Sequence, residues 1–140
     1  MSGVELRIAE ARSRIAGKEG NADRTGEFVS VPTRHRARAI AWYRDVLGLR
    51  VSADAAGEAE APGLTLSFGV PKEGGEMFVP NESGIAFRAA DVDAAVEEVR
   101  GSGGNVIGVE DTGVCKMGFV RDPDGNVVIF YPRYAEEPDE

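Results

Sequence analysis

The stretch Trp42-Tyr-Arg-Asp-Val-Leu-Gly-Leu-Arg50 joins the end of a predicted helix to the start of a predicted strand. Thr33 is a candidate N-cap for this helix, and Gly48 lies where a helix ends, because glycine readily takes the left-handed conformation of a C-terminal cap. An extended stretch at 27–31 precedes the helix, and strand-like runs at 49–53, 64–70 and 76–79 follow it. Four apolar residues at helical spacing form the stripe that predicts the helix: Ile40, Tyr43, Val46 and Leu47.

The same order of elements recurs in the second half of the chain. A strand-like run at 84–88 is followed by Asp91, a good N-cap, and Gly101 ends the helix that Asp91 begins. The apolar stripe of this helix falls at i, i+3, i+4 and i+7: Val92, Ala95, Val96 and Val99. Runs at 105–109, 115–120 and 126–131 supply three more strands. The two halves are offset by roughly 55 residues, and they predict an α+β fold of two βαβββ modules.

Composition and charge narrow the class of protein. The chain has 140 residues, a formal charge of −8 and 42% hydrophobic residues, as expected for one globular domain. The acidic balance argues against a nucleic-acid partner, because nucleic acids are bound by clustered positive charge. No apolar run approaches the roughly 18 residues of a membrane span, so we expect no membrane partner. No basic-then-apolar leader opens the chain, and a single cysteine, Cys115, excludes an internal disulfide. We therefore expect a cytoplasmic protein.

The two ends of the chain differ from the part between them. Apolar residues at helical spacing predict a short amphipathic helix within an N-terminal extension at 1–23, either an arm on a partner subunit or a loosely attached segment. The domain is expected at 24–134, with module one at about 26–80 and module two at about 83–134. Residues 135–140 form an acidic tail.

Three motifs, in this order and at this spacing, carry a resemblance to a known family. They are Trp42-Tyr-Arg-Asp-Val-Leu-Gly-Leu-Arg50, Asp91-Val-Asp-Ala-Ala95 and Phe119-Val-Arg-Asp-Pro-Asp-Gly-Asn126. From about residue 26 to residue 134 the chain resembles the glyoxalase / bleomycin-resistance / extradiol-dioxygenase superfamily, also called the vicinal oxygen chelate (VOC) superfamily. The resemblance implies that the two βαβββ modules curl into a cup-shaped sheet and that the chain pairs as a homodimer.

Many members of this family hold one divalent metal ion in the cup, through a His on the first strand of each module and a Glu on the last strand. Carried onto this sequence, those positions fall on Phe28, on Gly84 (or Ile85, one residue later) and on Ile129. None of these side chains binds a metal. Glu27 does not replace Phe28, because neighbouring side chains on a strand point to opposite faces. With one histidine, His35, in the chain, we expect no metal and no cofactor.

Alternation along the strands then predicts which side chains line the cup. The candidates are Phe28, Ser30, Glu76, Phe78, Gly84, Ala86, Arg88, Ile129 and Tyr131. This set is apolar and aromatic with a few polar groups, as is usual for small-molecule sites. The first hypothesis is therefore a binding protein, not an enzyme, that encloses a hydrophobic or aromatic molecule without a metal.

Other interpretations remain open. The alternative hypothesis is a cofactor-free isomerase or cyclase that uses Tyr131, Glu76 or Arg88, and a further one is a divalent-metal lyase or dioxygenase of the same superfamily. The basic run at 34–38 is either an anion site at a helix N-terminus or a solvated helix face. Asp122 and Asp124 are interpreted as turn residues, because Pro123 and Gly125 complete a hairpin turn around them.

Overall fold

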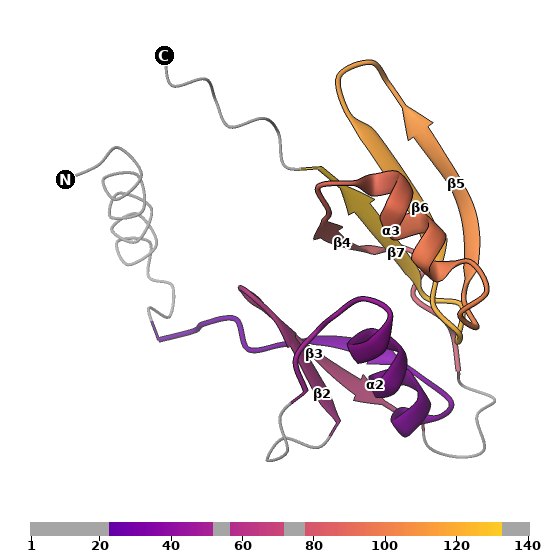
Figure 1. Ribbon diagram of the computed structural model, residues 1–140. Coiled ribbons are helices and arrows are strands. Elements are labelled where there is room, and N and C mark those ends of the chain that lie inside the picture. Colours follow the sequence, from indigo (N-terminus) through magenta and orange to yellow (C-terminus); the bar gives the residue numbers. More distant parts are fainter. Residues whose placement is uncertain (1–22, 52–56, 72–77, 133–140) are drawn as a thin grey trace.

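The computed structural model describes residues 23–51, 57–71 and 78–132 (Figure 1). Module one contains β1 (Val29–Pro32), helix α2 (Arg36–Asp45), β2 (Glu58–Ala61) and β3 (Leu64–Gly69). These strands form a sheet in the order β1-β3-β2, with β1 and β3 parallel. Arg50 forms an isolated antiparallel bridge with Glu60, and this bridge stands where the sequence predicted a strand at 49–53. Module one therefore follows the βαβββ order, with a single bridge in place of one strand.

Module two repeats this arrangement with longer strands. It contains β4 (Ile85–Arg88), helix α3 (Val92–Val99), β5 (Asn105–Asp111), β6 (Lys116–Arg121) and β7 (Val127–Tyr131). The sheet order is β4-β7-β6-β5, and β4 is parallel to β7 as β1 is to β3. The predicted α+β fold of two βαβββ modules is confirmed.

The prediction of a strand at 76–79 is wrong at the two positions that the structure describes, 78 and 79. Phe78 and Val79 belong to no strand, whereas Glu76 lies outside the described residues. The place beside β1 is taken by β3, so the chain after β3 leads from one module to the other. Strand β2 was not predicted, because its Glu-Ala-Glu-Ala sequence lacks the β-branched and aromatic residues that favour strands. The predicted helix within 1–23 and the acidic tail also lie outside the described residues.

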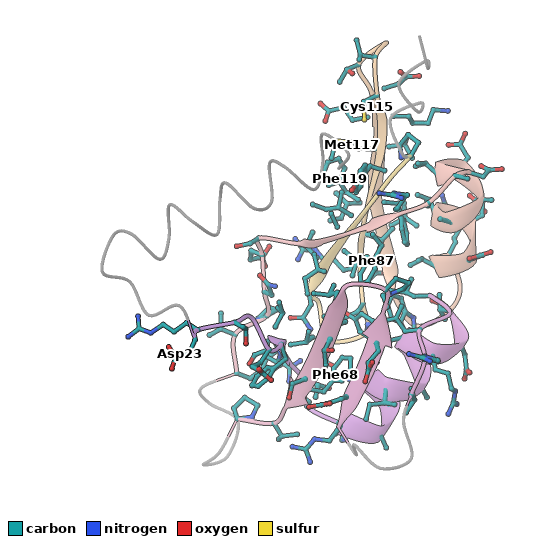
Figure 2. The ribbon with its side chains drawn as sticks, turned by 90° about the vertical axis from the view of Figure 1, so that its left-hand side faces the viewer. Asp23, Phe68, Phe87, Cys115, Met117 and Phe119 are labelled. Atoms are coloured by element: carbon teal, nitrogen blue, oxygen red, sulfur yellow. The ribbon has the colours of Figure 1, made fainter. Side chains whose placement is uncertain are left out.

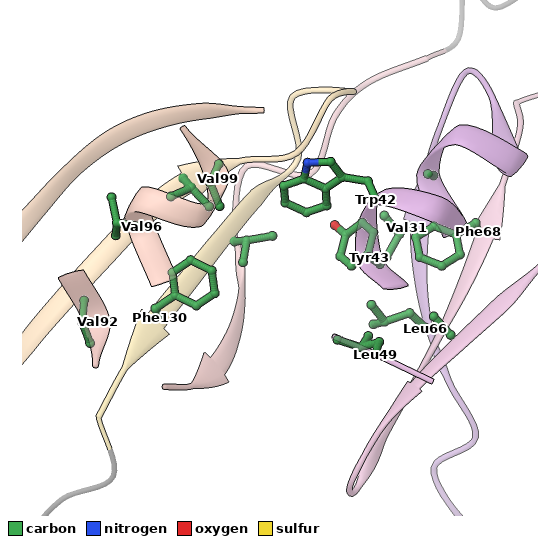
Figure 3. Packing of buried hydrophobic residues seen from close by; sticks show 14 residues of the cluster. Val31, Trp42, Tyr43, Leu49, Leu66, Phe68, Val92, Val96, Val99 and Phe130 are labelled. Carbon is green, nitrogen blue, oxygen red and sulfur yellow. The ribbon is translucent and has the colours of Figure 1, made fainter. Parts of the chain in front are cut away.

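One apolar cluster runs through both modules (Figure 3). In module one, the ring centroids of Tyr43 on α2 and Phe68 on β3 are 5.0 Å apart. In module two, α3 lies so close to β6 that a Cβ added to Gly118 would stand 2.5 Å from Val96 Cγ2. Phe68 in one sheet, and Val128 and Phe130 in the other, therefore lie on the face that packs against the helix. The opposite face of each sheet, turned away from the helix, is called the cup face below.

The turn at 122–126 fastens module two to module one. The Tyr43 hydroxyl donates to Asp122 Oδ2 at 2.8 Å, and Asn126 Nδ2 donates to the Pro32 carbonyl at 2.8 Å. Asp124 accepts hydrogen bonds from Thr33 Oγ1 at 2.5 Å and from Arg38 Nη2 at 2.8 Å. The two aspartates and Asn126 are buried, yet each has its hydrogen-bond partners. The interpretation of these aspartates as structural turn residues agrees with these contacts.

Of the two predicted helix N-caps, one is confirmed and one is wrong. Asp91 caps α3 as expected, because its Oδ1 accepts from the Ala94 N–H at 3.0 Å. The N-cap of α2 is His35, not Thr33. The Thr33 hydroxyl accepts from the His35 N–H at 3.0 Å and donates to Asp124 instead. Thr33 lies two residues before the observed cap, and its hydroxyl is used in joining the modules.

Candidate functional site

The three family metal positions lie at or beside the strands that the resemblance implied. Phe28 immediately precedes β1 and is 56% exposed, Gly84 immediately precedes β4, and Ile129 lies in β7. Ile129 is on the cup face, because its neighbours Val128 and Phe130 are buried on the helix side. None of the three side chains has a nitrogen, oxygen or sulfur donor, so these positions do not fit a metal ion.

The space above Gly84 is filled. A Cβ added to Gly84 would lie 2.8 Å from Ile129 Cδ1 and 3.1 Å from Val127 Cγ1. Gly84 also has φ +90°, a conformation that side-chain-bearing residues rarely adopt. A side chain at position 84 would therefore have no room, because the Ile129 side chain occupies the space next to Gly84.

The strand register arranges the cup face of module two into two rows across the sheet. The first row, called the apolar row, runs from Ala86 to Ile129 to Phe119 to Gly108. The second row, called the polar-ended row, begins with Arg88 beside Tyr131 and ends with Met117 beside Glu110. The antiparallel register that pairs Gly118 with Phe130 brings Met117 opposite Tyr131.

Met117 and Phe119 were not among the predicted cup residues. Figure 2 shows them following Cys115 along β6. Pairing β6 with β7 would have predicted them, because Phe119 pairs directly with Ile129 and Met117 lies on the same face two residues away. Cys115 is a free, partly buried thiol at the start of this strand.

The cup face of module one is polar. Ser30 pairs with Ser67, and Ser67 also pairs with Glu58 on the next strand. Glu60 follows Glu58 on the same face and has an ion-pair distance of 3.8 Å to Arg50. The two modules thus offer different surfaces, hydroxyl and carboxylate groups in module one and apolar side chains in module two.

A groove of about 950 Å³ separates the two modules. Module one contributes the end of α2 and the β2–β3 hairpin, and module two contributes β4, α3 and the end of β7. Residues of both faces of β4, the edge strand of its sheet, line this groove. Phe87 and Phe130 contribute apolar lining, and Arg88 and Tyr131 also line it. Of the predicted cup residues, the groove brings together Ala86, Arg88 and Tyr131.

Other predicted site residues are placed elsewhere. Phe78 is buried between the modules, and its ring lies 4.0 Å below the Arg34 guanidinium. Within the basic run, Arg36 Nε donates to the Phe68 carbonyl at 3.0 Å, and Arg38 pairs with Asp124. Because these arginines are engaged in contacts within the chain, the structure favours a structural role for the basic run over an anion site.

The ionisable groups of the described residues form no metal centre. Within residues 23–51, 57–71 and 78–132, no group of three or more His, Cys, Asp or Glu side chains is arranged to hold a metal ion. Burial, with the negative charge of Asp122 beside it, raises the pKa of Tyr43 far above its ordinary value. Tyr43 is therefore a neutral hydrogen-bond donor to Asp122. No helix in the described part of the chain is long and apolar enough to cross a membrane.

Comparison with known proteins agrees with the fold and its doubled pattern. The chain belongs to the Glyoxalase/Bleomycin resistance protein/Dioxygenase superfamily, whose family model matches residues 26–130. The resemblance carried by the three sequence motifs is thereby confirmed. No curated protein matches the sequence.

Several solved structures share this fold at low sequence identity. The hypothetical protein SA1046 from S. aureus has a TM-score of 0.66 and 16% identity, over 79% of this chain and 94% of that one. A glyoxalase/bleomycin resistance protein/dioxygenase family enzyme from Burkholderia phytofirmans PsJN has a TM-score of 0.64 and 16% identity, over 75% and 95%. A lactoylglutathione lyase from Agrobacterium tumefaciens has a TM-score of 0.59 and 18% identity, over 82% and 98%. At these identities the likeness concerns the fold alone.

Proposed function

We propose that this protein binds a small hydrophobic or aromatic molecule on the cup face of module two, without a metal ion. The observation that carries the proposal is the packing of Ile129 against Gly84, which supports apolar contacts at two of the positions that the family resemblance assigns to metal ligands. The apolar row from Ala86 through Ile129 to Phe119 supports it, because such a surface favours an apolar ligand.

A homodimer is part of the proposal, since the cup face of a single chain is open. Phe28 and Val29 are apolar and exposed at β1, which is an edge strand of its sheet. An exposed apolar edge favours association with another chain. A second copy that covers this edge would close the cup around the ligand. The lone thiol of Cys115 is consistent with a reducing, cytoplasmic compartment.

Metal content is the direct test of this proposal. Untagged protein purified without chelator is dialysed and assayed by elemental analysis, before and after soaking in Mn, Fe, Ni, Zn and Co salts. We expect no bound metal under either condition. About one tightly held metal ion per chain would overturn the metal-free proposal. Light scattering at micromolar concentration tests the homodimer, and a monomer would remove the shared cup.

A cofactor-free enzyme is the second candidate, and one observation favours it. Arg88 and Tyr131 are register partners on β4 and β7, and both line the groove. A guanidinium next to a phenol can stabilise a developing anion and exchange a proton. If the bound molecule is converted, Tyr131→Phe should abolish turnover and largely preserve binding. Recovery of the ligand chemically unchanged after long incubation would reject this alternative. A metal-dependent lyase or dioxygenase of the superfamily has no donor set at the family positions to support it.

A further inference from the structure

Two polar side chains on the cup face of module two have no partner within the described part of the chain. Arg88 makes no side-chain hydrogen bond or ion pair with any residue that the structure describes, and neither does the Tyr131 hydroxyl. The two residues are direct neighbours on parallel strands and point to the same face. The two side chains therefore project from neighbouring positions on one face, and their donor groups are free to bind a ligand.

The surroundings of this pair are apolar on one side and open on the other. The apolar row lies next to it, because Ala86 and Ile129 precede Arg88 and Tyr131 by two residues on the same face. Arg88, Tyr131 and Ala86 also line the groove between the modules, whereas Ile129 and Phe119 do not. Two carboxylates also line the groove: Glu98, which comes from α3 on the helix side of the sheet, and Glu60, which has an ion-pair distance of 3.8 Å to Arg50.

The polar-ended row carries opposite charges at its two ends. Arg88 is on the edge strand β4, and Glu110 is on the opposite edge strand β5. Three strand spacings of about 4.8 Å separate the two edges, so the backbones at the two positions lie about 14 Å apart. An anionic group is attracted to the Arg88 end and repelled from the Glu110 end. The row therefore gives a bound anion one orientation.

We propose that the ligand is an aromatic or apolar carboxylate, whose carboxylate binds Arg88 and Tyr131 and whose apolar body covers Ala86, Ile129 and Phe119. This inference rests on the proposed binding function and adds the chemical class of the ligand. The planar guanidinium donates two parallel hydrogen bonds to a carboxylate, and the phenol supplies a third. The neighbouring apolar row excludes water from one side of the pair, which strengthens these bonds.

The test compares two probes that differ only in charge: 2-naphthoate and its neutral analogue 2-naphthamide. Binding of each is measured by isothermal titration calorimetry in 50 mM and 500 mM NaCl. We expect naphthoate to bind at least about tenfold more tightly than naphthamide at low salt, because hydrogen bonds to charged groups are the stronger ones. We expect the preference to shrink at high salt.

Three variants test which side chain causes the preference for naphthoate over naphthamide. Arg88→Gln should remove it by weakening naphthoate binding about tenfold or more, with naphthamide binding unchanged. Tyr131→Phe should weaken naphthoate binding by a smaller factor. Arg100→Gln is the matched control, because Arg100 is an exposed arginine paired with Glu97 at the end of α3, and it should leave both affinities unchanged.

The outcomes separate the two proposals. Equal affinity for the two probes, or a preference that survives Arg88→Gln, would overturn the carboxylate assignment while leaving the binding function in place. Binding of neither probe at millimolar concentration would overturn both the assignment and the proposed aromatic binding function. A preference lost in Arg88→Gln and kept in Arg100→Gln would support both.

Discussion

The contact between β6 and α3 allows a sharp test of the packing, because Gly118 has no room for a side chain. A Cβ at this position would lie 2.5 Å from Val96 Cγ2 and 3.0 Å from Val92 Cγ1. Such distances are shorter than real carbon contacts, so Gly118→Ala must displace the helix or distort the strand. Forcing an extra methyl group into a packed core typically costs about 1–3 kcal/mol.

Gly108→Ala on the neighbouring strand is the matched control. Nothing lies within 4 Å of a Cβ added to Gly108, and neither Gly108 nor Gly118 has a positive φ. Both substitutions reduce the entropy of the unfolded chain to the same extent, which by itself stabilises a protein by about 0.4–1 kcal/mol. The difference in unfolding free energy between the two variants therefore isolates the clash, and we expect about 2 kcal/mol.

Urea unfolding followed by circular dichroism measures this difference. With an m value of about 2 kcal/mol per molar, the two midpoints should differ by about 1 M. A second substitution, Val96→Ala, removes the methyl groups that the new Cβ meets. In that background the cost of Gly118→Ala should fall by about 1 kcal/mol or more. Equal stability of Gly118→Ala and Gly108→Ala would refute the close approach of α3 to β6.

Two further predictions concern the junction of the modules. Asp124→Ala should lower the unfolding free energy by about 2 kcal/mol or more, because buried Thr33 and half-exposed Arg38 lose their acceptor. Asp93→Ala is the control: its partner Lys116 lies at the surface, so the loss of unfolding free energy in the same urea titration should be much smaller. The raised pKa of Tyr43 keeps this phenol protonated in the folded state above pH 10.0, whereas it ionises in the unfolded state. The contribution of the Tyr43 phenol to stability is complete below pH 10.0 and is lost as the pH rises above that value. The unfolding free energy of Tyr43→Phe should therefore fall less steeply with rising alkaline pH than that of the wild type. Parallel curves for the two proteins in urea titrations between pH 9 and pH 11 would contradict a buried hydroxyl.

Much of the fold could be predicted from local sequence patterns. The stripes of both helices, the Asp91 cap and the turn ending at Gly125 each depend on residues within a few positions of one another. Such spacings are set by the periods of helices and strands, so they are visible in the chain itself. The doubled order of elements then indicated two βαβββ modules, and the three motifs indicated the family.

The predicted strand at 76–79 and the missed β2 show where local patterns fail. The Glu-Ala-Glu-Ala sequence of β2 becomes a strand because β3 pairs with it, although its composition does not favour one. Phe78 is buried by packing below Arg34 outside any strand. In both places the surroundings, which come from other parts of the chain, outweigh the intrinsic preference.

The sequence by itself determined both helices, the doubled order of elements and the absence of donor side chains at Phe28, Gly84 and Ile129, because each of these follows from residue identity and short spacings. Only the tertiary structure decided that Ile129 fills the space over Gly84 and that Arg88 stands beside Tyr131 at a groove. It also joined Asp124 to Thr33, 91 residues earlier in the chain. These contacts depend on strand register and on the docking of the two modules. Strand register and module docking are set by long-range packing, so they cannot be predicted from periodicity along the chain.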